Sequence, residues 1–481
     1  MTTDISATCL TLTSPADILA AVPYLVGFHP ADSLIVVGLA QSRAKVAARW
    51  NVPMPPGTLA PLTALFQREE VSQVVVVGYG PGEAVTPAVD EATAIAAGAG
   101  VEVAEALRAH DGRYWSYVCD SATCCPPEGT PYDPRSSRVA AEATVRGLVA
   151  LPDRQTLQRT IAPATGPVRL AMRRATADAI HTLRTALTTT SGGAVSAVHP
   201  VSDGAVSAEA GAYGVGAGAV SDVADSGPGS AVSGVSGGAV SAVHPVSGGA
   251  VSAEAGAYGV GAGAVSDVAV PESASGVPRV SGGAVSASDE FAGVFVAEGL
   301  ARVRAALARA AAGDRLDDAE AARLGLALAV IRVRDEAWTL MDDSHIGLWK
   351  DLTRRLEPAF IPPVASLLAM AGWRAGDSIL ATIALERALA IDPHYSMANL
   401  LMHALQHLLP PAVLDGRMPA PDELDAAMGE PRASWLQPLL ALIEHHPEPD
   451  ALHADDLGPS AFPSDTWPST GTPDLADEKT T

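Results

Sequence analysis

Three of the four cysteines lie in one short segment, at Cys119, Cys124 and Cys125. Thiolates bind zinc and other soft metals, and they also carry redox chemistry. Neighbouring side chains of an extended backbone point to opposite sides, so Cys124 and Cys125 are not expected to bind one ion. A complete zinc site would also need Cys9 or His110. The preferred interpretation is that the thiols pack as small apolar groups, with metal binding second and redox chemistry third. No cofactor beyond substoichiometric zinc is expected.

A second candidate site precedes the first predicted strand, where His29, Asp32 and Ser33 share one turn. These residue types can move protons or activate a nucleophile. Neighbours in a turn seldom adopt the geometry of a catalytic triad, so bonding to the local backbone is the preferred interpretation. The alternative is a ligand pocket between sheet and helices. The side chains that such a pocket would use are His29, Asp32, Trp115, Tyr117, Glu128 and the three cysteines.

The cysteine segment follows a predicted hairpin. Residues 101–110 and 113–118 alternate around Asp111-Gly112, a dipeptide typical of tight hairpin turns. Further strands are expected at 33–39, 44–52 and 71–78, with helices at 58–69 and from Thr86 to about 97. The glycine-rich segment 78–82 lacks the remaining residues of a phosphate-binding motif and is interpreted as a tight turn. Together these elements predict a mixed α/β sheet domain.

From residue 136 onward the pattern predicts helices. They span 136–151, 154–161, 167–187, 289–312, 317–340, 345–356, 361–375, 377–391 and 395–409. The small residues of 361–391, followed by Pro393, resemble one tetratricopeptide repeat, in which two antiparallel helices approach closely. Ala365 and Gly372 stand where that repeat usually has aromatic residues, so a helical hairpin within a bundle is an equal alternative.

Two segments are not expected to fold. Residues 191–288 are rich in Gly, Ser and Ala, and 191–224 recur almost unchanged at 236–269. This composition provides too few large apolar side chains to offset the entropy of ordering the backbone. The expected organisation is an α/β domain (10–135), a helical segment (136–190), a flexible insertion (191–288), a helical domain (289–445) and a disordered acidic tail (446–481).

Charge and hydropathy exclude several classes of partner. The net charge is −23, and a field of this sign opposes binding to nucleic acid or anionic membranes. Arginines after residue 300 alternate with acidic residues, which indicates solvated helix faces. They are Arg302, Arg304, Arg309, Arg323, Arg332 and Arg334. No segment approaches the roughly 18 apolar residues of a membrane span, and no secretory signal is evident, so a cytoplasmic location is expected.

Long, irregular motifs carry a resemblance to a known family. They are PYLVGFHPADSL from Pro23, CDSATCCPPEGTP from Cys119 and ALERALAIDP from Ala384. On these motifs the chain resembles the actinobacterial domain-of-unknown-function family DUF4192, over about 10–188 and 290–445. The resemblance implies a soluble bacterial cytoplasmic protein and assigns no catalytic residue.

No candidate site combines an acid, a base and a nucleophile, whereas helical hairpins commonly present surfaces to partners. We therefore expect a non-enzymatic protein-interaction or regulatory module that uses helical hairpins and binds a protein partner. The alternative is an enzyme, or a small-ligand- or metal-binding protein, with a pocket near the 119–128 loop and His29.

Overall fold

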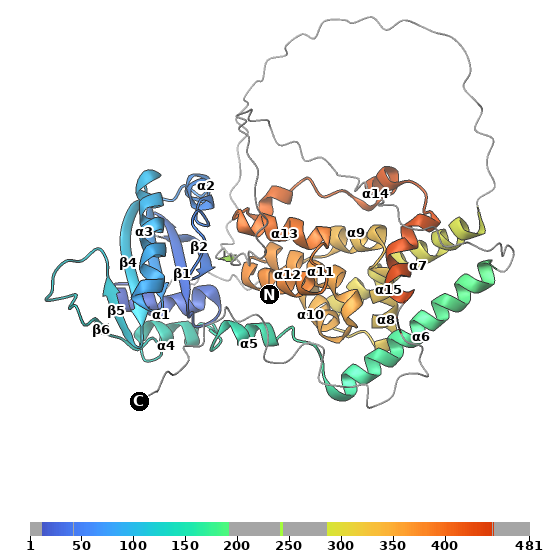
Figure 1. Cartoon of the computed structure of the whole chain (residues 1–481), viewed down its shortest axis with the longest axis horizontal. Helices are drawn as coiled ribbons and strands as arrows, with labels where there is room; N and C mark the ends of the chain where they lie inside the picture. The colour runs from blue at the N-terminus through green and yellow to red at the C-terminus, as the bar shows by residue number, and fades with distance from the viewer. Residues whose placement is uncertain (1–11, 42, 192–240, 244–285, 445, 447–481) are drawn as a thin grey trace, which may run out of the picture.

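The computed structural model describes residues 12–41, 43–191, 241–243, 286–444 and 446. An N-terminal mixed sheet with flanking helices lies beside a C-terminal helical region, which confirms the predicted fold class (Figure 1). In the described part of the chain, no helix is both long enough and apolar enough to cross a membrane.

The strands of the described residues form one sheet in the order β6-β5-β4-β3-β1-β2-β7. They are β1 (Ser33–Ala40), β2 (Arg43–Asn51), β3 (Gln73–Tyr79), β4 (Glu102–His110), β5 (Arg113–Ser116), β6 (Thr130–Pro131) and β7 (Ser241–Val243). Strands β3 and β4 are parallel, and the other neighbours are antiparallel. The predicted strands and the hairpin turn are therefore confirmed.

The short strand β7 lies within the segment predicted to be a flexible insertion. It pairs with β2, with Val243 opposite Ala47. Low-complexity composition did not suggest a strand there. The remainder of the insertion, and the predicted tail beyond residue 446, lie outside the described residues.

Both faces of the sheet are buried, because alternate residues of its central strands enter different cores. Ile35 and Val77 belong to a core that continues into α1 (Pro15–Val26) and the helical region. Leu34 and Val76 belong to a second core, which α2 (Pro61–Arg68) and α3 (Gly82–Gly98) complete. The sheet thus lies between the layer of α2 and α3 and most of the molecule, although Leu408 of the helical region also enters the second core.

The turn between β3 and α3 is set by close packing. A Cβ atom on Gly78 would lie 1.9 Å from Cγ1 of Val85, so only glycine allows α3 to pack this closely. Helix α3 begins at Gly82, earlier than the predicted cap at Thr86. The Thr86 hydroxyl does not cap the helix; it lies 2.7 Å from the Tyr117 hydroxyl.

Helices α4 (Arg138–Val145), α5 (Arg154–Arg159) and α6 (Gly166–Ser191) lead from the sheet to the helical region (Figure 1). That region contains α7 (Ala287–Ala311), α8 (Asp318–Ala327), α9 (Ile331–Leu340), α10 (Ile346–Arg355), α11 (Ile361–Arg374), α12 (Ser378–Ile391), α13 (Ser396–Gln406), α14 (Pro421–Met428) and α15 (Gln437–Glu444). The prediction of one helix over 317–340 was wrong. The chain leaves helical geometry at Val330, which is extended, and Leu328 and Val330 both enter the core there.

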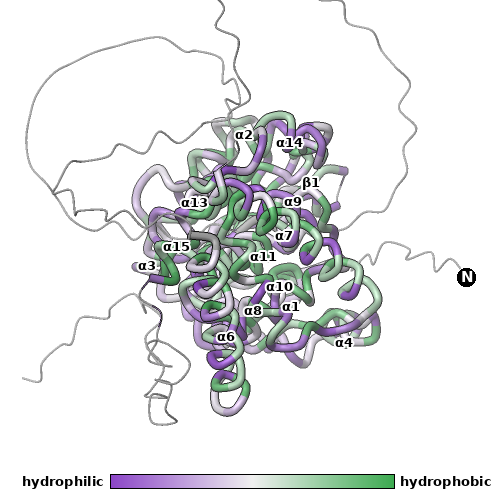
Figure 2. The backbone as a smooth tube through the Cα atoms, turned by 90° about the vertical axis from the view of Figure 1, so that its right-hand side faces the viewer, coloured by the Kyte–Doolittle hydropathy of each residue, from purple (hydrophilic) through white to green (hydrophobic). Residues whose placement is uncertain are grey.

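The hairpin of α11 and α12 forms the centre of the helical region. Every residue of α11 from Ile361 through Trp373 is buried. Close approach of the two helices is visible at Gly372, where a Cβ atom would lie 3.3 Å from the Asp377 carbonyl oxygen. Figure 2 shows the hydrophobic stretch of α11 within the bundle. This hairpin therefore serves as core, not as an exposed surface.

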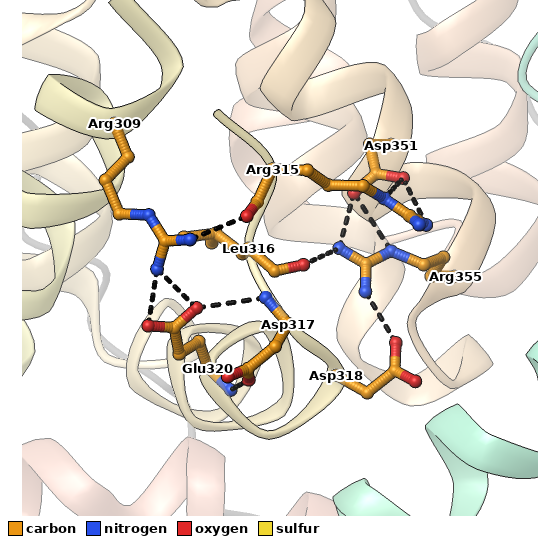
Figure 3. A network of polar contacts seen from close by, with 8 residues as sticks. All are labelled: Arg309, Arg315, Leu316, Asp317, Asp318, Glu320, Asp351 and Arg355. Atoms are coloured by element: carbon orange, nitrogen blue, oxygen red, sulfur yellow. Dashed lines mark hydrogen bonds and ion pairs between the residues drawn. The ribbon is translucent and has the colours of Figure 1, made fainter. Parts of the chain in front are cut away.

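Some arginines that the sequence placed on solvated faces are buried in ion pairs. Arg332 is 1% exposed, and its guanidinium pairs with Glu336 at 2.8 Å and Asp425 at 2.7 Å, because α14 covers α9. Figure 3 shows a second network, in which three arginines meet acidic partners. Its ion pairs join Arg309 to Glu320, Arg315 to Asp351, and Arg355 to Asp351 and Asp318.

Candidate functional site

The cysteine segment forms a surface loop after β5, residues 118–129, which we call the thiol loop. The three Sγ atoms all lie within 4.8 Å of one another, and Sγ of Cys119 is 3.1 Å from Sγ of Cys124. The amides of Cys124 and Cys125 both donate to the Ser121 carbonyl, at 3.2 and 2.8 Å. This turn replaces the extended backbone that the sequence analysis assumed. The adjacent thiols therefore converge, and the geometric objection to a shared metal was wrong.

The pKa values of Cys124 and Cys125 are shifted in opposite directions. A hydrogen bond with Cys119 is the main cause that lowers the pKa of the Cys124 thiol. Hydrogen bonding with Cys119, followed by burial, raises the pKa of Cys125 to about 12. Cys124 is also the exposed member of the group, so it is the thiol that meets an incoming ligand first.

Side chains of β4 and β5 hold the thiol loop against the edge of the sheet. Nε1 of Trp115 donates to the Pro127 carbonyl at 2.9 Å, and Nη1 of Arg113 donates to the Gly129 carbonyl at 2.8 Å. The guanidinium of Arg108 stacks over the Trp115 ring at 3.7 Å from its centroid. Gly129 has φ +81°, and a Cβ there would lie 2.6 Å from the Trp115 ring, so the loop closes only with glycine.

His29 and Asp32 do not join the thiol loop. They precede β1, which β3 and β4 separate from β5, a distance of about 14 Å at the usual spacing of strands. The His29 amide donates to the Leu151 carbonyl at 2.9 Å, and burial lowers the pKa of its imidazole. Asp32 is exposed, and the Ser33 hydroxyl donates to the Ala31 carbonyl at 2.6 Å. This bond agrees with the local role that the sequence indicated for the turn.

The other predicted ligand residues lie at the edges of the thiol loop or away from it. Tyr117 points to α3, where its hydroxyl meets Thr86. Glu128 is exposed, and its backbone carbonyl accepts a bond from Arg113. His110 interacts with Asp111, at 3.4 Å from Nε2 to Oδ2, and is not in the thiol group. Cys9 lies outside the described residues.

Two clefts of the described structure lie elsewhere. One of about 610 Å³ is lined in part by Asp342, Arg374 and Asp415, and one of about 350 Å³ lies between α6 and α15. None of the predicted site residues lines either cleft. The site that sequence and structure share is therefore the thiol loop, with Arg108 and Arg113 as supporting residues that the sequence did not reveal.

A family model described as domain of unknown function (DUF4192) matches residues 15–225 and 263–412. The chain belongs to the DUF4192 family. No curated protein and no solved structure matches it significantly. The DUF4192 match includes strands β1 to β6 of the sheet, the thiol loop and the α11–α12 hairpin, but its description assigns no activity. Function must therefore be argued from the geometry of the site.

Proposed function

We propose that this protein binds a thiophilic metal ion, zinc first, through Cys119, Cys124 and Cys125. The observation that carries the proposal is the convergence of three sulfur atoms within 4.8 Å in a loop that the sheet edge supports. Zinc bonds thiolate sulfur at about 2.3 Å, which puts tetrahedral sulfur ligands about 3.8 Å apart. The observed sulfur separations, 3.1 Å between Cys119 and Cys124 and within 4.8 Å for all three, lie around that spacing.

The centre offers three protein ligands and leaves the fourth position to a water molecule or an exogenous group. Zinc sites that only stabilise a fold are usually closed by four protein ligands, whereas exchangeable and catalytic sites keep a position open. Cys124 is exposed, so a fourth ligand can approach from solvent. We therefore propose an exchangeable metal centre, suited to metal delivery, metal sensing or a reaction at the open position.

The burial of the helical hairpin supports metal binding over the alternative function, a partner-binding helical module. The helical hairpin that motivated the partner-binding interpretation buries α11 almost completely and contributes it to the core. The thiol loop, by contrast, combines reactive side chains with exposure to solvent. Reactive groups placed on a loop of a rigid sheet are typical of functional sites.

Titration with Co²⁺ under reducing, oxygen-free conditions tests the proposal. Thiolate ligation gives sulfur-to-cobalt charge-transfer bands, and Zn²⁺ should abolish them at one equivalent per chain. Cys124→Ser should remove the bands, whereas the matched control Cys9→Ser should keep them. Absence of the bands in the parent protein, or equal loss in Cys9→Ser, would contradict a three-thiolate centre with an open position.

A further inference from the structure

Two arginines bond to the segment that connects α5 to α6, and a third lies in the first turn of α6. The Arg354 carbonyl accepts a bond from the Ala164 amide at 2.7 Å. Arg169 belongs to α6, Arg354 to α10 and Arg387 to α12, and we call them the arginine cluster. Arg387 is 8% exposed, and its Nη1 donates to the Ile161 carbonyl. Burial, together with the charges of Arg169 and Arg354, lowers the pKa of Arg387 to about 10. The side chain therefore remains a cation at neutral pH.

The arginine cluster carries more positive charge than the acidic side chain beside it can balance. Within the described residues, Nε of Arg387 has no hydrogen-bond partner, and no ion pair involves Arg387 or Arg354. Glu357 approaches the cluster, with Oε2 3.6 Å from Nη2 of Arg169, and its buried Oε1 has no partner among the described residues. Nε of Arg173 lies 3.9 Å from the same Oε2, so Glu357 is shared with a fourth arginine, and the arginine cluster keeps an excess of positive charge.

We propose that the arginine cluster binds an oxyanion of the phosphate class, either free phosphate or the phosphate group of a small metabolite. A phosphate dianion would offset this excess of positive charge. Its oxygens suit the planar fork of N–H donors that arginine presents, and it would supply the acceptor that Nε of Arg387 lacks. Nε of Arg387 is buried without a hydrogen-bond partner among the described residues, so a ligand that accepts from it gains affinity.

The location also allows a ligand to enter. Arg354 is exposed, and the side chain of Arg169 is 21% exposed, whereas Arg387 forms the buried end of the cluster. An oxyanion in solvent can therefore meet the two accessible members of the cluster, Arg354 and Arg169. In a chain of net charge −23, general attraction of anions is weak, so binding would depend on this local excess of arginine.

Calorimetric titration with inorganic phosphate, at ionic strength matched with sodium chloride, tests the proposal in the full chain. We expect saturable binding at one site per chain. Arg169→Gln and Arg354→Gln should each weaken it by about tenfold, which is the usual effect of losing one charge-assisted hydrogen bond. Both side chains are accessible to solvent, so these variants are expected to fold, which circular dichroism checks.

Arg174→Gln is the matched control, because Arg174 is an exposed arginine on the same helix. It should bind phosphate as the parent does. Cys124→Ser should also bind phosphate normally, which separates this site from the proposed metal centre. The proposal fails if chloride produces the same response as phosphate, or if Arg169→Gln and Arg354→Gln bind as tightly as Arg174→Gln.

Discussion

The surroundings of Arg355 and Arg387 differ although both guanidiniums are buried in the helical region. Arg355 is 2% exposed and donates to Asp351 at 2.9 Å, to Asp318 at 2.7 Å and to the Leu316 carbonyl at 3.1 Å (Figure 3). Among the described residues, Arg387 has a single hydrogen bond, to the Ile161 carbonyl. Burial of a cation is expensive in both places, but only the first is compensated by acidic partners. The difference indicates that Arg355 stabilises the fold, whereas Arg387 keeps a hydrogen-bond donor that a ligand can use.

The largest expected effect is at Arg355, whose charge is balanced by acidic partners. Asp351→Ala removes the carboxylate that Arg315 and Arg355 share, and it leaves Arg355 buried with one acidic partner. We expect the free energy of unfolding to fall by about 3 kcal/mol, as when one partner of a buried pair is removed. Urea denaturation measures it. Asp314→Ala, at an exposed position nearby, is the control and should change stability by less than about 0.5 kcal/mol. Equal values for the two variants would contradict the stabilising role of the network.

One substitution made at both arginines compares the two sites directly. Arg355→Met should lower the free energy of unfolding by about 2 kcal/mol, because Asp351 and Asp318 lose hydrogen bonds to a charged partner. Arg387→Met should change it by no more than about 1 kcal/mol in phosphate-free buffer, because no carboxylate is left unpaired. Thermal and urea unfolding give both values. If Arg387→Met lowers the free energy of unfolding as much as Arg355→Met does, then Arg387 is a structural residue. The proposed difference between the two arginines would then be wrong.

Local patterns predicted the elements of the fold well, but not the pairing of charges. The β-branched run at residues 74–77 and the turn Asp111-Gly112 suffice for the strands and the hairpin. Arg332 was assigned to a solvated face because its sequence neighbours alternate in charge, yet α14 covers it from about ninety positions away. The arginine cluster likewise depends on contacts between distant helices. Contacts between helices that are far apart in the sequence cannot be predicted from the local pattern of residues.

The thiol loop shows the same limit at shorter range. The sequence identified the correct residues, Cys119, Cys124 and Cys125, but it could not show that a turn at Ser121 brings adjacent thiols together. It also suggested a pocket shared with His29, which the order of strands in the sheet separates from the loop. Residue types were therefore predictable, and distances between segments were not.

The sheet domain offers a further site for this comparison. Like the arginine cluster, the thiol loop holds polar groups whose bonding a ligand would complete. Trp115 is half-buried, with Nε1 bonded to the Pro127 carbonyl. Trp115→Ala should lower the free energy of unfolding by about 2 kcal/mol, less than for a fully buried aromatic residue. It should also weaken Co²⁺ binding, because the loop loses its support. Glu128→Gln, at an exposed position, should change neither quantity. Unaltered Co²⁺ binding in Trp115→Ala would show that the loop forms the centre without this support.

The smallest expected effect tests whether this chain itself supplies the acid that Arg387 lacks. Residues 448–481 contain eight Asp or Glu and one Lys, and they lie outside the described residues. If the tail neutralised the arginine cluster, its deletion would uncover a buried charge and lower the free energy of unfolding by about 3 kcal/mol. We expect instead a change below about 0.5 kcal/mol, as for removal of a segment that does not pack. Phosphate affinity should also stay the same, because a tail that occupied the cluster would compete with phosphate and its removal would tighten binding. Urea denaturation and calorimetric titration of the truncated chain decide between these outcomes, and a large loss of stability would make Arg387 a paired residue like Arg355.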